Sequence, residues 1–550
     1  MGKETARGEP SLMMFKRCAV ALGGLLTIGA ASPATMAVDS AAANRVHATV
    51  QFLADDLLEG RDTGSRGHEI AAAYVASQFQ ALGLQPGGEN GGWFQRVPLR
   101  TASLNGPAAA WLNGQPLAIG QDISVRPSIV QQQQDVTAPL VFVGYGIDAP
   151  QIGVTDYRGL DLTGKIAVAL DGTPDGLNTE IAAHLGSYKA QMAAKAGALG
   201  LVTIPAQVEP SARQRSAGAP RPVTNWVDTA GRNGGVPASL RVTASMTGTG
   251  ASKLFAGASR SYAQLLAEAA RKGARPAGFA LPGKLRISRT SSWRDFTSPE
   301  VIGVLPGSDP ALRGEYVVLM GHLDHLGMRP DPKPGEHAVN NGALDNAAGV
   351  ATMLETARSF TASGRRPRRS VMFIANTGEE KGLLGADYFA AHPTVAAERI
   401  AALVDLDMPL PLYDFTDVIP FGAEHSTVAK VVARAGASMG IAVARDPMPE
   451  ESIFVRSDHY RFVLRGVPAI LLMTGWSNGG QPVWQNFLKN VYHSPRDNLL
   501  QPIRWDQLAK YAELNYRISR DLADAAERPR WYQGDFFGDS FAPGQPRAAR

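Results

Sequence analysis

Apolar stretches alternate with amphipathic segments through the second half of the chain. Four of the apolar stretches have the length and composition of buried strands. They lie at residues 316–320, 371–376, 400–407 and 468–473. Residues 347–360 and 383–391 carry apolar positions at helical spacing, and 505–525 predicts a final helix. Buried strands separated by helices are typical of a mainly parallel sheet covered on both faces. We therefore predict an α/β fold with a mainly parallel mixed sheet.

The first half of the chain has a different pattern of apolar and polar residues. Residues 43–85 have a helical pattern that stops at Gly83. From about residue 100, short strand-like pieces are interleaved with glycine, proline and glutamine, and one helix is expected at 187–196. These patterns predict a β-rich domain inserted into the α/β domain.

The expected domain boundaries lie where the pattern of predicted helices and strands changes along the chain. The α/β domain is divided into an N-terminal part, an inserted β-rich domain and a second part, followed by a glycine- and proline-rich tail that we expect to be flexible. In that order the segments are 38–120, 121–286, 287–528 and 529–550.

The N-terminus has the pattern of a signal peptide. Lys16 and Arg17 precede the apolar residues 18–31, and small residues at 34–37 suit cleavage after Ala37. The apolar run is too short for a spanning helix, and no later segment is long and apolar enough to cross a membrane. The single cysteine, Cys18, lies in this segment, so the mature chain would contain no disulfide. We therefore expect a signal peptide over residues 1–37 and a bacterial periplasmic or secreted protein.

Size and charge narrow the class of protein. A chain of 550 residues holds two or three domains. The net charge is only +4, and the basic run at 365–369 is short. Nucleic acid is therefore not an expected partner.

Histidines and carboxylates follow successive strands of the predicted sheet. In open α/β sheets, ligands bind beyond the carboxyl ends of the strands. Imidazole and carboxylate are zinc ligands, and five of them with one shared carboxylate can hold two zinc ions. The five candidates are His322, Asp345, Glu380, Asp407 and His493. Asp405 and Asp407 point to the same side of their strand, so alternation alone does not choose between them.

The adjacent pair Glu379 and Glu380 needs an explanation, because neighbouring carboxylates repel each other. One explanation is that Glu379 caps a helix. The other is that Glu380 holds a metal ion while Glu379, left unliganded, takes a proton from water as a general base.

These motifs resemble the zinc-dependent aminopeptidases of the M28 peptidase family, in the branch with an inserted protease-associated (PA) domain. The metal-site motifs occur in the family's order. They are 321-GHLDHLG-327, 343-ALDN-346, the Glu-Glu-x-Gly of residues 379–382, 403-LVDLDMP-409 and 491-VYHSPRDN-498. The resemblance extends to residues 52–86 and, in the insert, to 143–146 and 161–165.

The resemblance implies a zinc exopeptidase fold, two zinc ions and a role for each motif. Asp345 would bridge the ions, its peptide bond to Asn346 would be cis, and Asp407 rather than Asp405 would be a ligand. Glu379 would be the base, Tyr492 would polarise the scissile carbonyl, and Asp324 would orient His322 from outside the metal shell. His325 is expected at the rim of the site.

The expected activity is removal of N-terminal residues from peptides with a free N-terminus. A carboxypeptidase and a non-catalytic, receptor-like binding protein on this scaffold are the alternatives. A single-zinc cyclase is disfavoured by the inserted domain. Trp476 and Phe454 are candidates for lining a substrate pocket, although core packing is their more common role.

Overall fold

The computed structural model describes residues 40–207, 221–235 and 237–550. Its main sheet confirms the predicted α/β class. Strands β15, β14, β16 and β19 are neighbours in that order and run parallel, while β13 and β17 pair antiparallel at the two sides. The strands are β13 (Phe279–Leu305), β14 (Tyr316–His322), β15 (Ser370–Asn376), β16 (Ile400–Asp405), β17 (Asp417–Phe421) and β19 (Ala469–Thr474), with the short β18 (Ala442–Val443) beside β17.

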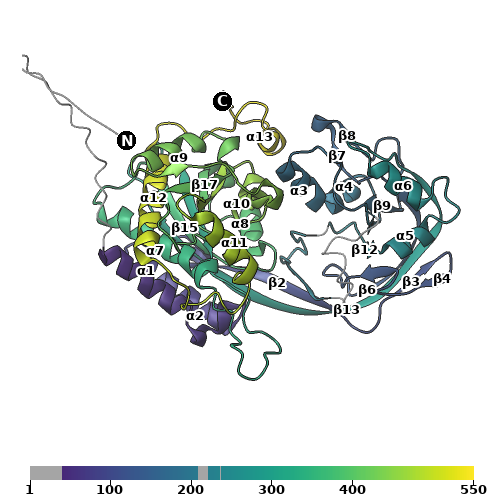
Figure 1. Cartoon of the computed structure of the whole chain (residues 1–550), viewed down its shortest axis with the longest axis horizontal. Helices are drawn as coiled ribbons and strands as arrows, with labels where there is room; N and C mark the ends of the chain where they lie inside the picture. Colours follow the sequence, from purple (N-terminus) through teal and green to yellow (C-terminus); the bar gives the residue numbers. More distant parts are fainter. Residues whose placement is uncertain (1–39, 208–220, 236) are drawn as a thin grey trace, which may run out of the picture. The chain divides into compact units, whose positions relative to one another are not determined.

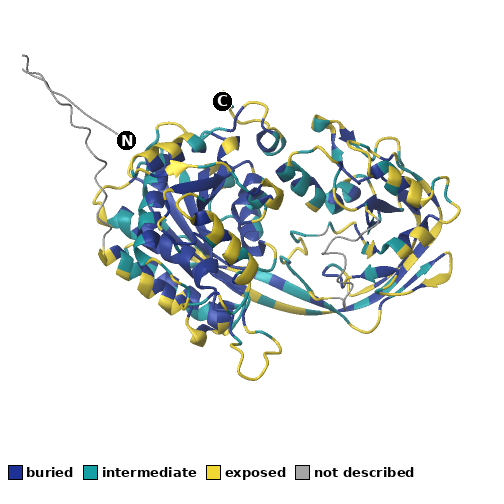
Figure 2. Ribbon diagram, in the orientation of Figure 1, coloured by how far each residue is buried: buried dark blue, intermediate teal, exposed yellow. Residues whose placement is uncertain are grey.

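Two groups of helices pack against this sheet (Figure 1). The first group is α1 (Ser40–Leu53), α7 (Ala348–Ala362), α9 (Val428–Ala437) and α12 (Trp505–Asp524). The second group is α8 (Leu384–Ala391) and α10 (His459–Val463), while α2 (Arg66–Ala81) packs on β13. Every residue of β15, β16 and β19 is buried, as the dark strands in Figure 2 show. Burial on both faces explains why these strands are continuous apolar runs in the sequence.

The insert has a sheet of its own. Its strand order is β4–β3–β13–β6–β9–β10–β12–β5, and β6, β9, β10 and β12 run parallel. The strands are β3 (Ala109–Leu112), β4 (Gln115–Leu117), β5 (Ile123–Val125), β6 (Gln133–Phe142), β9 (Ile166–Leu170), β10 (Gly200–Ile204) and β12 (Val242–Met246). The helices are α3 (Thr179–Ser187), α4 (Lys189–Lys195), α5 (Gly248–Leu254) and α6 (Tyr262–Ala269). The single helix expected at 187–196 is therefore part of two helices, which meet at Tyr188.

Strand β13 belongs to both sheets. Its first part pairs with β3 and β6 of the insert, its middle pairs with β2 (Phe94–Leu104), and its last residues pair with β15. The expected boundary between residues 286 and 287 thus falls inside one continuous strand. Polar residues alternate along this strand, because much of it has one exposed face.

The C-terminal segment is packed, in contrast to the flexible tail expected for residues 529–550. Trp531 is 1% exposed, Phe537 of α13 (Phe536–Phe541) is fully buried, and the Trp531 indole donates to the Gly466 carbonyl at 3.0 Å. Burial of these two aromatic side chains outweighs the glycine and proline content on which the expectation was based.

Candidate metal centre

The predicted ligands converge at the carboxyl edge of the parallel strands. His322 is the last residue of β14, and Glu379 and Glu380 form the turn between β15 and α8. Asp407 follows β16 by two residues, and Asp345 lies in the turn before α7. Because β15, β14 and β16 are parallel neighbours, their carboxyl ends share one edge.

The first group of candidate ligands consists of His322, Asp345 and Asp407. His322 Nε2 lies 3.2 Å from Asp345 Oδ1 and 3.2 Å from Asp407 Oδ1. The other ring nitrogen, Nδ1, lies 3.0 Å from the Asp324 carbonyl oxygen, which can only accept a hydrogen bond. Nδ1 therefore carries the proton, which leaves the Nε2 lone pair of a neutral ring for a metal ion.

The second group shares Asp345 with the first. His493 Nε2 lies 3.3 Å from Asp345 Oδ2 and 3.2 Å from Glu380 Oε2. His325 Nδ1 lies 2.7 Å from Glu380 Oε1 and 3.9 Å from Asp345 Oδ2. The two oxygens of Asp345 thus face different groups, which is the arrangement that a bridging carboxylate requires.

The donor atoms of both groups fit metal ions. Atoms of His322, Asp345 and Asp407 lie within 4.8 Å of one another, and so do atoms of His325, Asp345 and Glu380. Asp345 Oδ2, Glu380 Oε1 and both nitrogens of His325 are buried without a well-formed hydrogen bond to any described residue. Buried carboxylate oxygens whose hydrogen bonds are poorly formed are unfavourable, and a cation between the groups would satisfy them.

The charges of the group are strongly coupled. Burial raises the pKa of Glu379 well above its ordinary value, and repulsion by Glu380 and Asp407 adds to the shift. Burial lowers the pKa of His322, but the carboxylates of Asp407 and Asp345 outweigh it and hold that pKa well above the ordinary value. Protons on His322 and Glu379 therefore offset the negative charge of the group, as bound cations would in a metal site.

The turn that carries Asp345 is held from both sides. The carboxylate of Asp497 accepts hydrogen bonds from the backbone nitrogens of Leu344 and Asp345, both at 2.9 Å. The Asp345–Asn346 peptide bond is cis, as the resemblance implied. Asn346 Nδ2 donates to the Leu406 carbonyl at 3.0 Å, which ties this turn to the residue before Asp407.

Arg61 provides a second support beneath the site. Its buried guanidinium donates to the carbonyls of Leu323, Asn341, Gly342 and Leu53. Burial lowers the pKa of Arg61 to about 10, although nearby carboxylates, chiefly Asp497 and Asp324, favour the charged form. A fixed cation therefore holds the loops on either side of the ligand groups.

Asp405 and Asp407 have different partners. Asp405 Oδ2 accepts from the backbone nitrogen of His459 at 3.1 Å and lies 3.1 Å from its Nδ1. Asp407 is the one that reaches His322. Ser457 Oγ lies between the two, 2.8 Å from Asp405 and 2.9 Å from Asp407. The geometry therefore favours Asp407 as the candidate ligand.

Two residues differ from their expected positions. His325 is fully buried beside Glu380 rather than at the rim, and the sequence signal for it was its spacing of three residues from His322. Asp324 contacts His322 through its backbone carbonyl, since its carboxylate lies 4.0 Å from Nδ1. That carboxylate accepts from Thr63 Oγ1 at 2.7 Å and from the Glu379 backbone nitrogen at 3.3 Å.

A cavity of about 260 Å³ opens beside the groups. Glu379, Tyr492, Asp345 and Asp407 line it, and the Tyr492 ring stacks on His493 at 3.7 Å. Burial raises the pKa of Tyr492 above its ordinary value, so its hydroxyl keeps its proton at neutral pH. The expected base and the expected hydroxyl donor thus face the same space.

Part of the lining of this cavity is an apolar wall. It is formed by Met408, Ile453, Leu471, Met473, Trp484 and Leu488. The aromatic residue of the wall is thus Trp484, on α11 (Gly480–Asn490), which the sequence pattern did not single out. Phe454 is fully buried in the hydrophobic core, which confirms the ordinary packing role for that residue.

Residues 300–519 match Peptidase family M28, and this segment contains both ligand groups. The chain carries a Peptidase family M28 domain. A probable zinc metalloprotease of Pyrenophora teres f. teres (strain 0-1) is 38% identical over 108 residues, which are 20% of this chain and 22% of that protein. A vacuolar membrane protease of Sclerotinia sclerotiorum (strain ATCC 18683 / 1980 / Ss-1) is 27% identical over 197 residues, 34% of this chain and 16% of that protein. The chain thus spans less than a quarter of the length of these relatives.

Among solved structures, the chain is similar to an aminopeptidase from Aneurinibacillus sp. strain AM-1. The match has a TM-score of 0.49 and 20% sequence identity, and it covers 88% of this chain and 94% of that chain.

The expected location, a bacterial periplasmic or secreted protein, is wrong. The curated relatives above are fungal, and several further fungal relatives are also named vacuolar membrane protease. A basic and apolar N-terminal pattern indicates that a chain enters a translocation route, and bacteria and eukaryotes share such routes. The pattern does not indicate which compartment the protein reaches. The expected signal peptide lies outside the described residues. No helix among the described residues has both the length and the apolar character needed to cross a bilayer.

Proposed function

We propose that this chain is a zinc aminopeptidase that holds two zinc ions and removes N-terminal residues from peptides. The observation that carries the proposal is the sharing of Asp345 by two ligand groups beside a cavity that Glu379 lines. The names of the relatives that it matches, zinc metalloprotease and vacuolar membrane protease, support hydrolysis of peptide bonds.

The proposed ligands divide between the two ions. His322, Asp345 and Asp407 would hold one ion, and Asp345, Glu380 and His493 the other, with His325 beside Glu380. When bound, zinc supplies Lewis-acid polarisation of the peptide carbonyl and lowers the pKa of water.

Glu379 is the proposed general base. Its carboxylate faces the cavity and has no ligand role in either group, so it is available to take a proton from water and return it to the leaving amine. The hydroxyl of Tyr492, held by stacking on His493, would donate to the carbonyl oxygen as negative charge develops on it.

The apolar wall of the cavity provides the proposed binding site for the substrate side chain. Met473, Trp484 and Leu488 would exclude water from an aliphatic or aromatic side chain. The substrate class that fits is therefore a peptide with a free amine and an apolar first residue. We also propose that the insert is a PA domain, from its residues 143–146 and 161–165.

The test is hydrolysis of aminoacyl anilides, each compared with its N-acetylated counterpart, by the full chain supplied with zinc. The proposal expects turnover of leucyl and phenylalanyl anilides, at least about tenfold slower turnover of lysyl and aspartyl anilides, and none of the acetylated forms. Chelation should abolish activity and zinc should restore it. Turnover of acetylated substrates at an equal rate would exclude an aminopeptidase.

One observation favours a second candidate, a carboxypeptidase. Arg456 lines the cavity, where it pairs with Glu451 at 2.9 Å, and a guanidinium could hold a terminal carboxylate. In that case Arg456→Ala would abolish cleavage of N-acetylated peptides with a free C-terminus. If zinc binds and neither substrate class is cleaved, the protein is a binding protein on this scaffold.

A further inference from the structure

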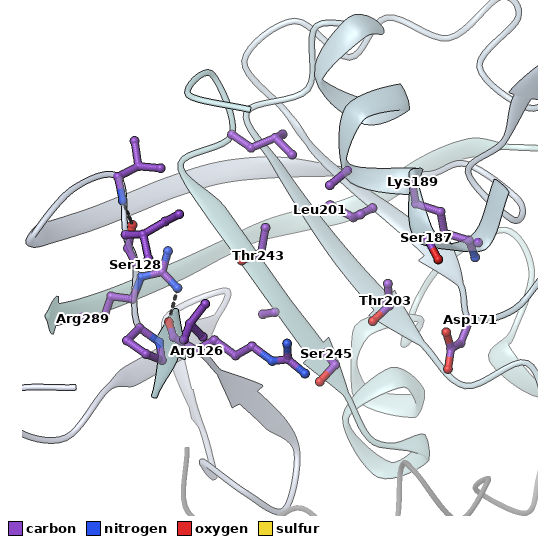
Figure 3. Close-up of a pocket in the computed structure, with 18 residues that line it drawn as sticks. Arg126, Ser128, Asp171, Ser187, Lys189, Leu201, Thr203, Thr243, Ser245 and Arg289 are labelled. Atoms are coloured by element: carbon purple, nitrogen blue, oxygen red, sulfur yellow. Dashed lines mark hydrogen bonds between the residues drawn. The ribbon is translucent and has the colours of Figure 1, made fainter. Parts of the chain in front are cut away.

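A second cavity lies on the sheet of the insert, and the proposed peptidase function does not use it. It has a volume of about 350 Å³ and lies over strands β10 and β12, beside the junction of α3 and α4 (Figure 3). Five hydroxyl side chains line it, those of Ser128, Ser187, Thr203, Thr243 and Ser245.

Three of these hydroxyls form a regular array on one face of the insert sheet. Thr203 on β10 pairs with Ser245 on β12, and Leu201 pairs with Thr243, so all four side chains project to the same side. The alternate residues Val202 and Val242 are buried in the hydrophobic core of the opposite face. Of the two faces of β10 and β12, the one that forms the floor of the cavity therefore carries the three hydroxyls.

Two buried cations contribute to the walls of the cavity. Lys189 and Arg289 are 4% and 6% exposed, and neither lies within ion-pairing distance of a carboxylate among the described residues. Lys189 Nζ donates to the Leu170 carbonyl at 2.5 Å. Arg289 Nε donates to Gln134 Oε1 at 2.6 Å, and its other nitrogens donate to the carbonyls of Arg126 and Arg241.

All of these acceptors are neutral. The carboxylates of Asp171 and Asp156 lie near enough to Lys189 to favour its charged form. Among the described residues, no carboxylate acts on Arg289 in this way, so the Arg289 charge is hydrogen-bonded but not neutralised locally. A buried charge without a counter-charge is costly, and an anion in the cavity would offset that cost. Burial lowers the pKa of Lys189 to about 8 and that of Arg289 to about 10, which leaves both groups mainly protonated at neutral pH.

A third cation, Arg126, lines the cavity from an exposed position, and Figure 3 shows its side chain extending toward Ser245. Asp171 is the carboxylate among the described lining residues, and it lies on the side of Lys189. The side formed by Arg126 and Arg289 is therefore the positively charged one, with hydroxyl donors next to it.

We propose that this cavity is a binding site for a small organic oxyanion. The carboxylate or phosphate group of the ligand lies between Arg126 and Arg289 and accepts hydrogen bonds from Ser245 and Thr243. Guanidinium groups with adjacent hydroxyls match the geometry of both oxyanions, and the volume admits a small metabolite-sized molecule but not a folded partner.

The test is calorimetric titration of the zinc-loaded full chain with succinate, with inorganic phosphate and with uncharged succinamide. We expect succinate or phosphate to bind and succinamide not to bind. Binding of succinate alone identifies a carboxylate site, and binding of phosphate alone a phosphate site. Arg126→Gln should weaken binding about tenfold or more, because it removes a charge-assisted contact.

Arg158→Gln is the matched control, because Arg158 is also an exposed arginine of the insert but lies outside the lining of the cavity. Ser245→Ala is the second variant and should weaken binding without a change of charge. Dissociation constants above about 10 mM for both anions would overturn the proposal. Equal affinity in the wild type and in Arg126→Gln would also overturn it, since the anion would then bind elsewhere, for example at the zinc ligands.

Discussion

At the scale of single residues, the adjacent glutamates of the turn after β15 have different surroundings. Glu380 lies within 3.2 Å of His493 and 2.7 Å of His325, whereas Glu379 faces the cavity. Exchange of either carboxylate for an amide keeps the size of the side chain. The two exchanges should therefore produce different defects.

We expect Glu379→Gln to lower kcat by about 10²–10⁴-fold while zinc content and thermal stability stay unchanged, because only proton transfer is lost. Glu380→Gln should instead reduce the zinc content of the purified protein, because it removes a proposed ligand. Turnover numbers measured together with metal analysis separate the two. Loss of zinc from Glu379→Gln, or normal zinc in an inactive Glu380→Gln, would reverse the assignment.

The sequence was sufficient to select most of these residues, because His322, Glu380 and Asp407 lie at or just after the ends of recognisable apolar strands. Asp345 and His493 lie in loops and were selected by their motifs. His322, Asp345, Glu380, Asp407 and His493 lie in two groups as their positions suggested. The burial of His325 could not be read in the same way. Its position depends on Arg61, which is distant in the sequence. The Arg61 guanidinium donates to the Leu323 carbonyl at 2.9 Å, and the Arg61 carbonyl accepts from the His325 backbone nitrogen at 3.2 Å.

At the scale of elements, the first turn of α7 and the end of β16 meet through Asn346 and Gly349. The Asn346 side chain donates to the Leu406 carbonyl and accepts from the backbone nitrogens of Gly349 and Met408. A Cβ atom on Gly349 would overlap both the Leu406 carbonyl oxygen and the Asn346 side chain. Glycine is therefore required where these two elements cross.

We expect Gly349→Ala to destabilise the protein by about 1–3 kcal/mol and to weaken zinc binding, because it separates Asp345 from Asp407. Gly248→Ala is the matched control, since Gly248 begins α5 and has open space around its Cα. Urea unfolding and zinc titration measure the two effects. A Gly349→Ala protein with wild-type zinc affinity would show that this crossing does not position the ligands.

Elements of the α/β sheet were predictable because burial on both faces leaves an unbroken apolar run. Strands β14 to β16 and helices α7, α8 and α12 begin and end within a few residues of the expected positions. Strand β13 was not predictable. Its 27 residues pass from one sheet to the other, and only their partners, β6 and β15, determine where each part belongs.

At the scale of the whole molecule, the C-terminal segment is joined to the body of the protein through His425. Its Nδ1 lies 2.7 Å from Asp535 Oδ2, and its Nε2 lies 3.1 Å from Glu180 Oε2 in the insert. Glu180, Glu424 and His425 could also be taken for a metal group, but the contacts of His425 with two carboxylates are those of a protonated imidazole. Burial lowers its pKa, and the hydrogen bonds with Asp535 and Glu180 outweigh burial and raise it to about 10.

This shift fixes the direction of a pH effect on stability. The pKa of histidine in the unfolded chain is about 6.5, so the stabilisation is fully present below that pH and is lost as pH rises through 10. Between pH 6 and pH 10 the free energy of unfolding of the wild type should fall by roughly 3–5 kcal/mol more than that of His425→Gln. Urea unfolding of both proteins at the two pH values measures the difference, because the other titrating groups are common to both. If the free energies of unfolding of the two proteins change equally between these pH values, His425 is neutral in the folded protein. Aromatic packing, and not an ion pair, would then hold the C-terminal segment.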